Sequence, residues 1–463
     1  MFKYLLLAVA LWVPAAWSQT PANCAPQDVS LGGTINGQLT SASCNLDTLF
    51  NWSPAFAQVY RFAITQRGTV TLEMTASFDS RLYLLDARGN FRASSHRTNG
   101  LAVRVFEALE PGTYQVVAAA ADRSTGPFRL TSWFRNAQIC PVTQISLDTS
   151  QSGTLDADSC RAGDLMFGTS NEDFAAQFRF SVSQRGTISI DASSDLYEAR
   201  VYLLDSRYNF RTSSRTVSYS TTRTFEALDP GTYIIVVTAR DGASGAFSLK
   251  GIFRNPQICP KAPIGLSASA GGLFSPSSCR VGDLMFGNSN EGFAVQYTLT
   301  LAKRGTLTVD AASEEVRPGI YLTDARYNFI TSSRVVASGQ AHTFESLDPG
   351  SYVVIVFAQP EETGAYTVKT DFRNPEICPS ENLANNSIDG DALTSSSCKV
   401  GDLLFGSWNE NYAKQYRIHL SQRMPLVVGM HSEDFDSVLY LTDSKFNFLT
   451  SDDNSGQGFD ARI

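Results

Sequence analysis

The stretch FEALDPGTYIIVV, Phe225 to Val237, is repeated almost unchanged at two other places in this chain of 463 residues. The earlier copy is FEALEPGTYQVVA at 106–118, the later copy is FESLDPGSYVVIV at 344–356, and a fourth copy begins with FDARI at 459–463. In each full copy a Pro-Gly turn precedes a mostly apolar run, which is typical of a strand in the centre of a sheet. The stretch therefore predicts a repeated β domain whose core needs this segment.

The cysteines give the period of the repeat. Two cysteines 20 residues apart open each unit, and the first cysteines of successive units are separated by 116, 119 and 119 residues. A unit of this length has the size of an independent domain. We therefore predict four tandem units, repeats 1 to 4, with short and semi-rigid joints, at 24–139, 140–258, 259–377 and 378–463.

Repeat 4 stops before its copy of the Pro-Gly turn. Without the strands on either side of that turn, a sandwich would expose apolar edges. We expect the sequence to be a fragment of a longer product. The alternative is a C-terminus that borrows a strand from a partner.

Alternating apolar and polar residues predict the strands within each unit. QFRFSVSQRGTISIDAS at 177–193 alternates on both sides of Arg185 and Gly186, which predicts a hairpin. A second hairpin is expected around a type II turn with a positive φ at Gly231. We expect the ring of Tyr233 to tuck under this loop, with its hydroxyl bonded to the backbone.

About eight short strands separated by Gly, Pro and Asn, without a run of ten helical residues, define the fold class. We predict an all-β protein of tandem jelly-roll-like antiparallel β-sandwich domains, each with one disulfide. Pairing between units would leave Cys24 and Cys398 without partners, and metal binding needs closer cysteine or histidine pairs. Each disulfide would close a loop of about 20 residues, worth roughly 3 kcal/mol. The expected pairs are Cys24–Cys44, Cys140–Cys160, Cys259–Cys279 and Cys378–Cys398.

The N-terminus and the composition indicate an exported protein. Lys3, the apolar run Leu5–Val13 and the small residues of Ala16–Ser18 predict a signal peptide at 1–18. No later apolar run is long enough to cross a bilayer, so we expect no integral membrane segment after cleavage. The formal net charge of −8, with both signs interspersed, argues against nucleic acid or anionic lipid as a partner. We expect a secreted, periplasmic or cell-surface location, where disulfides persist.

No motif for catalysis stands out. The histidines, His96, His342, His419 and His431, fall at different positions in their units, and we interpret them as surface or strand residues. There is no HExxH, no Gly-x-Ser-x-Gly and no phosphate-binding glycine loop. We therefore predict no catalytic residue within these 463 residues.

Carboxylates offer a weak case for calcium. Asp434 and Asp436 lie in SEDFDSVLYLTD, and Asp79 occupies the position of Asp436 in repeat 1. Oxygen-rich clusters suit Ca²⁺, but repeat 3 has Arg317 at this position, so a solvated strand edge is the alternative. No other cofactor is expected. The aspartates that precede each x-Arg/Lys-x-Asn-Phe are expected to form Asx turns; they are Asp86, Asp205, Asp324 and Asp443.

Two recurring polar sets are candidates for a ligand-binding loop. One set is the glutamate that follows an asparagine in repeats 2 to 4, and the other lies in the Arg-Tyr-Asn-Phe turn. A turn with a buried aromatic residue is the interpretation we prefer, and any partner would be an extracellular polymer or protein surface. The candidates are Glu172, Glu291, Arg207, Tyr208, Asn209, Arg326, Tyr327 and Asn328.

The segment FDSRLYLLDARGNF at 78–91, followed by Pro111-Gly112-Thr113-Tyr114 and by GPFRL at 126–130, resembles the bacterial pre-peptidase C-terminal domain. Repeats 2 and 3 match this pattern through 201–203 with 230–233 and through 320–322 with 349–352, but they lack the strand aspartate. The cysteine pair is not part of the pattern.

The resemblance implies a secreted jelly-roll β-sandwich that is attached to hydrolases or surface proteins and lacks catalysis itself. Some relatives bind Ca²⁺ or polymeric substrates. We expect a non-catalytic exported protein with a binding or spacing role at the cell surface or outside the cell. The alternative is the accessory N-terminal region of a secreted hydrolase, a peptidase, whose catalytic domain lies beyond residue 463.

Overall fold

The computed structural model describes residues 24–47, 54–99 and 102–463. The predicted signal peptide, 1–18, lies outside the described residues. The chain divides into two compact units. The first contains the chain up to Val182 with Ser189–Thr224 and Gly231–Ile252, and the second contains Ser183–Ile188, Phe225–Pro230 and Phe253–Ile463.

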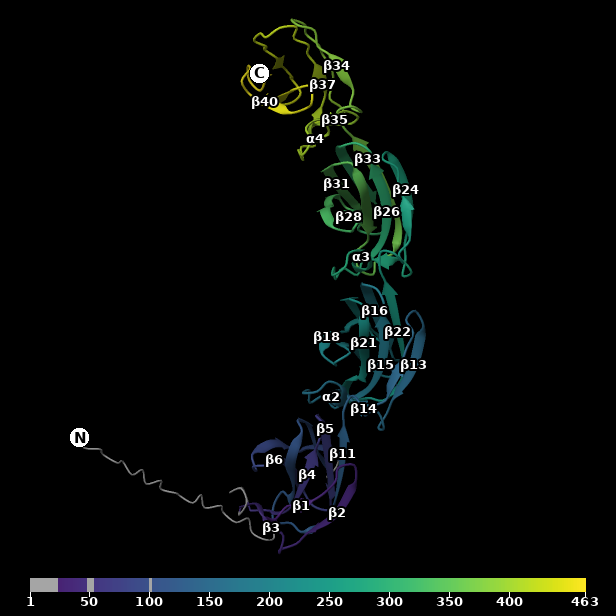
Figure 1. The fold of residues 1–463 in the computed structure, drawn as a ribbon, viewed down its shortest axis with the longest axis vertical. Helices are drawn as coiled ribbons and strands as arrows, with labels where there is room; N and C mark the ends of the chain where they lie inside the picture. Colours follow the sequence, from purple (N-terminus) through teal and green to yellow (C-terminus); the bar gives the residue numbers. More distant parts are fainter. Residues whose placement is uncertain (1–23, 48–53, 100–101) are drawn as a thin grey trace, which may run out of the picture. The chain divides into compact units, whose positions relative to one another are not determined.

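Repeat 1 contains two sheets that enclose a common apolar core (Figure 1). The first sheet has the order β1-β4-β10-β6-β7, with β3 beside β4; its strands are β1 (Gln27–Asp28), β3 (Cys44–Asn45), β4 (Phe56–Ile64), β6 (Ser80–Asp86), β7 (Phe91–Ser94) and β10 (Gly112–Ala120). The second sheet has the order β2-β11-β5-β9-β8; its strands are β2 (Thr34–Leu39), β5 (Gly68–Ala76), β8 (His96–Asn99), β9 (Ala102–Leu109) and β11 (Gly126–Arg135).

Repeat 2 has the same two sheets. The first is ordered β12-β15-β21-β17-β18, with β14 beside β15; its strands are β12 (Val142–Gln144), β14 (Cys160–Arg161), β15 (Phe174–Val182), β17 (Ala199–Asp205), β18 (Phe210–Ser213) and β21 (Gly231–Ala239). The second is ordered β13-β22-β16-β20-β19; its strands are β13 (Ser150–Leu155), β16 (Gly186–Ser193), β19 (Arg215–Ser218), β20 (Thr221–Leu228) and β22 (Gly245–Arg254).

Repeat 3 follows the same plan. Its first sheet is ordered β23-β26-β32-β28-β29, with β25 beside β26; the strands are β23 (Lys261–Pro263), β25 (Cys279–Arg280), β26 (Phe293–Leu301), β28 (Gly319–Asp324), β29 (Phe329–Ser332) and β32 (Gly350–Phe357). The second is ordered β24-β33-β27-β31-β30; the strands are β24 (Ala268–Phe274), β27 (Gly305–Ala312), β30 (Arg334–Ala337), β31 (Gln340–Leu347) and β33 (Gly364–Arg373). The predicted fold class, repeated β-sandwiches, is confirmed; one short edge strand per repeat pairs in parallel.

The apolar run that recurs in the sequence is the central strand of the first sheet, as predicted. In repeat 3, Val354 and Val356 of β32 belong to the core between the two sheets. Ile355, between them, belongs to a second apolar cluster that includes Cys259 and Cys279. Successive residues of β32 are therefore apolar because both faces of the strand are covered.

The two predicted hairpins are wrong. β15 and β16 are consecutive along the chain, but β15 lies in the first sheet of repeat 2 and β16 in the second. The same holds for β20 and β21. Each loop carries the chain from one sheet to the other, across a gap of about 10 Å. A Gly- or Pro-containing loop between two strands has the same local pattern in both situations, so the sequence did not distinguish them.

The predicted type II turn is also wrong. Gly231 does not have a positive φ; it is the first residue of β21 and pairs with Val182. The tyrosine two residues later behaves as expected in repeats 1 and 3. The hydroxyls of Tyr114 and Tyr352 donate to the carbonyl oxygen of the acidic residue four positions earlier, at 2.9 and 2.7 Å.

Four disulfides form, in the pairs expected from the spacing: Cys24–Cys44, Cys140–Cys160, Cys259–Cys279 and Cys378–Cys398. A one-turn helix follows the second cysteine in repeats 2 to 4, as α2 (Ala162–Leu165), α3 (Val281–Leu284) and α4 (Val400–Leu403). A further short turn, η2 (Arg240–Gly242), follows β21. The disulfide and α3 belong to one apolar cluster with β32. The segment that contains Cys279 and α3 therefore packs against the outer face of the first sheet.

Repeat 4 forms two-stranded ladders only, β34-β37, β35-β36, β38-β41 and β39-β40. Its strands are β34 (Ser380–Asn382), β35 (Cys398–Lys399), β36 (Tyr412–Ala413), β37 (Gln415–Arg417), β38 (Gly429–Met430), β39 (Leu439–Thr442), β40 (Phe448–Asp452) and β41 (Ala461–Arg462). Tyr416 and Tyr440 each remain 37% exposed. Within the described residues, repeat 4 therefore has no counterpart of the central strand β32.

Candidate functional site

The predicted candidates Arg207, Tyr208 and Asn209 form the turn after β17. Asp205 Oδ1 accepts the backbone N–H of Arg207 at 2.8 Å and that of Asn209 at 2.9 Å. Tyr208 has a φ of 64° and donates its hydroxyl to Gln177 Oε1 at 2.8 Å. The expected Asx turn is confirmed, and a binding role for these three residues stays a prediction.

The equivalent candidates of repeat 3 form the same turn. Asp324 Oδ1 accepts the N–H of Arg326 at 2.8 Å and that of Asn328 at 2.9 Å, and the hydroxyl of Tyr327 donates to Gln296. The side-chain hydrogen bond from Asn328 is the main cause that lowers the pKa of Asp324. The side chains of Asp324, Tyr327 and Asn328 hydrogen-bond in and around this turn, whereas Arg326 contributes its backbone N–H. A binding role for these candidates stays a prediction.

None of the calcium candidates belongs to a group of three or more potential metal ligands among the described residues. Asp79 Oδ1 lies 2.6 Å from a guanidinium nitrogen of Arg97, and Asp434 and Asp436 are exposed. Among the described residues, each group of potential metal ligands combines a disulfide pair with a nearby aspartate, at Asp164, Asp283 or Asp402. Because a disulfide offers no thiolate, these three groups are not metal centres.

Glu172, another candidate, lies where repeats 1 and 2 meet. Its Oε2 accepts a hydrogen bond from Arg104 Nη1 at 3.0 Å, and its Oε1 lies 3.3 Å from His96 Nε2. Arg104 also donates to Glu73 of β5 at 2.6 Å. The guanidinium of Arg104, whose side chain is 20% exposed, therefore bridges carboxylates of two repeats.

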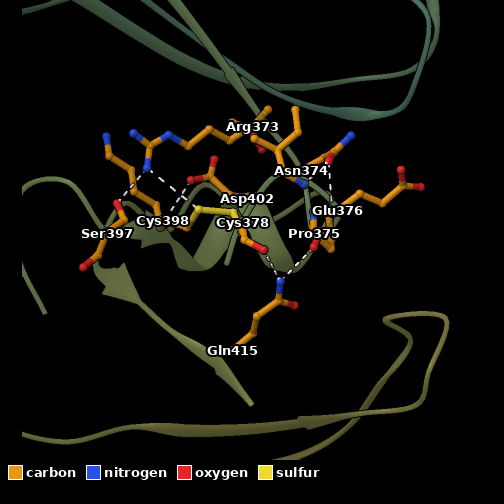
Figure 2. The surroundings of a disulfide bond; sticks show 12 residues. Arg373, Asn374, Pro375, Glu376, Cys378, Ser397, Cys398, Asp402 and Gln415 are labelled. Atoms are coloured by element: carbon orange, nitrogen blue, oxygen red, sulfur yellow. Dashed lines mark hydrogen bonds between the residues drawn. A yellow bond between two sulfur atoms is a disulfide. The ribbon is translucent and has the colours of Figure 1, made fainter. Parts of the chain in front are cut away.

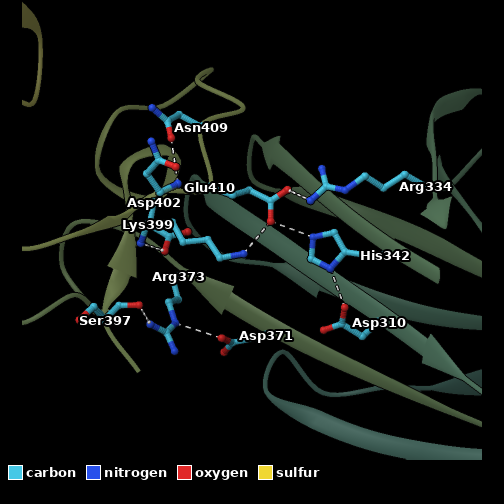
Figure 3. A network of polar contacts seen from close by, with 11 residues as sticks. Asp310, Arg334, His342, Asp371, Arg373, Ser397, Lys399, Asp402, Asn409 and Glu410 are labelled. Carbon is cyan, nitrogen blue, oxygen red and sulfur yellow. Dashed lines mark hydrogen bonds and ion pairs between the residues drawn. The ribbon is translucent and has the colours of Figure 1, made fainter. Parts of the chain in front are cut away.

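Glu410 has the equivalent position where repeats 3 and 4 meet (Figure 3). Its Oε2 accepts from Lys399 Nζ at 2.7 Å and lies 2.9 Å from His342 Nε2, while Oε1 pairs with Arg334. The other ring nitrogen of His342 lies 2.6 Å from Asp310 Oδ1. Burial acts to raise the pKa of Glu410, but the hydrogen bonds from the two cations outweigh it and lower the pKa.

The two junctions use the same positions of the repeat. Arg104 and His342 are each the third residue of β9 and β31, and His96 and Arg334 are each the first residue of β8 and β30. Arginine and histidine have thus exchanged places between the two junctions. His342 is a strand residue, as interpreted from the sequence, but its side chain is only 10% exposed and contacts two carboxylates, which the sequence did not indicate.

Glu291, the remaining glutamate candidate, is buried in the second unit. Its backbone oxygen accepts a hydrogen bond from Arg280 Nη1 at 2.5 Å, and its carboxylate lies 4.0 Å from the same guanidinium. Glu291 therefore lies among buried polar groups, and a binding role for it stays a prediction.

A glycine at the start of each one-turn helix allows close contact with the preceding repeat. The carbonyl oxygen of Gly163 accepts from Thr69 Oγ1 at 2.9 Å. A Cβ atom on Gly163 would lie 2.6 Å from the ring of Phe106 and 2.7 Å from the carbonyl oxygen of Thr169. Only glycine fits this position, since both neighbours belong to packed structure.

Gly401→Ala is therefore expected to loosen the contact between repeats 3 and 4. A Cβ atom would lie 2.5 Å from the carbonyl oxygen of Ser407 and 2.7 Å from the ring of Phe344, and overpacking of this kind costs about 1 kcal/mol or more. Limited proteolysis of the junction, with fragments identified by mass spectrometry, should be faster in this variant. Gly406→Ala is unsuitable as a control because its φ is +87°, whereas Gly390→Ala meets no neighbour within 4 Å and should cleave at the wild-type rate.

The linker between repeats 3 and 4 is fixed by hydrogen bonds (Figure 2). Asn374, 3% exposed, donates to the carbonyl oxygen of Arg304 at 3.2 Å and accepts the N–H of Glu376 at 3.0 Å. Gln415 donates to the carbonyl oxygens of Pro375 and Cys378, both at 2.7 Å. The joint is thus held from both repeats.

Neither Asn374 nor Gln415 is among the residues predicted from the sequence. Their signal is recurrence, since the linker asparagine is also Asn136 and Asn255, and the glutamine is also Gln177 and Gln296. Asn255 is fully buried and Gln177 is 2% exposed. A polar, uncharged residue that recurs in a linker indicates a buried hydrogen-bonding role.

No helix among the described residues has both the length and the apolar character needed to cross a membrane. No family model matches the sequence, and no curated protein matches it.

Solved structures of low similarity share the β character of the chain. A pre-peptidase C-terminal domain of a collagenase from Bacillus anthracis is 16% identical, with a TM-score of 0.20, over 24% of this chain and 94% of that chain. A protein described as secreted, from Eubacterium rectale, is 13% identical, with a TM-score of 0.18, over 51% of this chain and 80% of that chain. A tail fibre protein from a phage of E. coli is 8% identical, with a TM-score of 0.19, over 50% of this chain and 41% of that chain. The likeness is loose, concerns the β fold alone, and carries no argument about function.

Proposed function

We propose that this chain is a non-catalytic exported protein that acts as a spacer, in which neighbouring β-sandwich repeats hold one another through charged and hydrogen-bonded junctions. The observation that carries the proposal is the bridge formed by Arg104, which contacts Glu73 of its own repeat and Glu172 of the next. A half-buried charge that spans two domains favours one relative orientation, because other orientations would leave it without its second partner.

The recurring polar residues support the same proposal. Polar residues that recur in several repeats, and that were candidates for ligand binding, take part in turns or in contacts at the ends of repeats. Asn374 and Gln415 add hydrogen bonds across the linker. Export is supported by the four disulfides, because disulfides form and persist in oxidising compartments.

The experiment measures the distance distribution between repeats 1 and 2 in the full chain. Spin labels on noncanonical residues would replace Ala87 and Ser206, exposed residues of equivalent turns, and double electron–electron resonance would report their separation. A spacer requires one narrow distance peak. Arg104→Gln removes the bridging cation and should broaden that peak.

The matched control is Arg129→Gln, which removes the same charge from an exposed position of β11. Arg129 lies six residues before the end of β11, or about 20 Å along an extended strand. This control should leave the peak unchanged. A broad distribution in the wild type would contradict the spacer role, as would hydrolysis of peptidase substrates by the purified chain.

A further inference from the structure

His342 is held between two carboxylates. Its Nδ1 lies 2.6 Å from Asp310 Oδ1 and its Nε2 lies 2.9 Å from Glu410 Oε2 (Figure 3). A neutral imidazole has one N–H donor and one lone pair, whereas an imidazolium has two donors. With a neutral ring, one of these carboxylate oxygens would face a lone pair. Both carboxylates are therefore hydrogen-bonded only when both ring nitrogens of His342 are protonated.

Three further charged groups around His342 and its two carboxylate partners come from three elements. Arg334 of β30 is the register partner of His342, and Lys369 of β33 is the register partner of Asp310. Lys399 of β35 shares Glu410 with His342 and lies over the ring of Phe344 at 4.8 Å. Lys399 and Arg334 continue to hold Glu410 when the imidazole is neutral. Loss of the proton therefore weakens this junction without removing it.

The junction of repeats 1 and 2 provides an internal comparison. Arg104 occupies the position of His342, and a guanidinium stays charged at every physiological pH. His96 also faces Glu172 at this junction, but its side chain is 55% exposed, and an exposed ion pair contributes little. The bridge between repeats 1 and 2 therefore keeps its charge over the physiological pH range. The bridge between repeats 3 and 4 depends on the protonation of His342.

We propose that the Asp310–His342–Glu410 bridge makes the junction of repeats 3 and 4 a pH-sensitive latch, tight in acid and looser in weak alkali. Histidine is the side chain that ordinarily changes charge between pH 5 and 8. The stabilising double contact exists while both ring nitrogens of His342 carry a proton, and it is lost when one of them is deprotonated. The proposal rests on the proposed spacer role. Its consequence would be a joint between repeats 3 and 4 that is more rigid at acidic pH outside the cell than at alkaline pH.

The test compares the two junctions in the full chain. Spin labels at Ala325 and Ser444, exposed residues of the turns equivalent to those at Ala87 and Ser206, report the distance between repeats 3 and 4. From pH 5.5 to pH 8.5 the ratio of ordered to disordered populations should fall about tenfold, the effect of one charge-assisted hydrogen bond. The labels at Ala87 and Ser206 should show a much smaller change.

Two variants separate the latch from a general effect of pH. His342→Arg restores the arrangement found at Arg104 and should keep the ordered population at both pH values. His342→Gln carries no charge and should behave at pH 5.5 as the wild type does at pH 8.5. If the wild type is equally ordered at both pH values, or if His342→Arg loosens as the wild type does, the latch is refuted while the spacer role stands. If both junctions are broad at every pH, the spacer role itself fails.

Discussion

Replacing Cys259 and Cys279 by alanine should lower the free energy of unfolding of repeat 3 by about 3 kcal/mol. The disulfide closes a loop of 20 residues, so its removal gives the unfolded chain more conformations. Both sulfurs also belong to the apolar cluster on the outer face of β32, and the side chains of the two cysteines are almost fully buried. The loss should therefore fall on repeat 3 first.

The measurement is a urea titration of the full chain with pulse proteolysis, in which peptides from repeat 3 are followed by mass spectrometry. The matched comparison replaces Cys378 and Cys398, which close the same loop in repeat 4, and should leave the midpoint of repeat 3 unchanged. In wild-type protein with all four disulfides reduced, the midpoints of repeats 3 and 4 should match those of the two variants. An unchanged midpoint for repeat 3 in the first variant would show that the cystine does not stabilise the sandwich.

Asp283→Asn should remove a pH dependence of stability from repeat 3. Burial raises the pKa of Asp283 to about 6, although the hydrogen bond from the backbone N–H of Arg280 and nearby guanidinium charges oppose the shift. The ordinary value is about 3.9. The folded state therefore binds the proton more tightly than the unfolded state, and wild-type stability should fall as pH rises from about 4 to about 6.

The expected size of this fall is about 2–3 kcal/mol, at 1.36 kcal/mol for each unit of pKa. Asparagine cannot ionise and retains an oxygen that can accept the N–H of Arg280, so stability of the variant should be flat across this interval. Asp324→Asn is the control with the opposite sign. The pKa of Asp324 is lowered, so its ionised form stabilises repeat 3 above the ordinary carboxyl pKa and this contribution is lost in acid. If wild type and Asp283→Asn show the same slope, Asp283 does not titrate in this interval.

The disulfide Cys259–Cys279 and Asp283, which carry these two predictions, lie in the same segment, where the second cysteine is followed by the one-turn helix α3. Asp283 Oδ2 accepts the N–H of Arg280 at 2.7 Å, and the carboxylate lies within 4.8 Å of the sulfurs of Cys259 and Cys279. Thr187 Oγ1 donates to the carbonyl oxygen of Gly282 at 2.8 Å. The same few residues therefore close the outer apolar cluster and present the backbone to a neighbouring strand.

The sequence by itself determined the features that repeat with the chain. Four copies of a cysteine pair indicated the disulfides, because pairing within each unit repeats four times and uses every cysteine. The apolar run Ile234–Val237 determined the central strand, and the aspartate before each Arg/Lys-x-Asn turn determined the Asx turn. Each of these features depends either on residues close together in the sequence or on the burial of a single strand. Both can be recognised from the local pattern of residues.

Tertiary structure alone decided which strands pair and which repeats touch. The loops at Gly186 and Gly231 have the composition of hairpin turns, yet each crosses between sheets. Which strands pair depends on contacts between residues far apart in the sequence, which the composition of a loop does not report. Glu410 and His342 are 68 residues apart, and no local pattern states that their side chains meet. Their contact follows from how repeat 4 is joined to the sandwich of repeat 3, which depends on the packing around Gly401 and on the hydrogen bonds of Asn374.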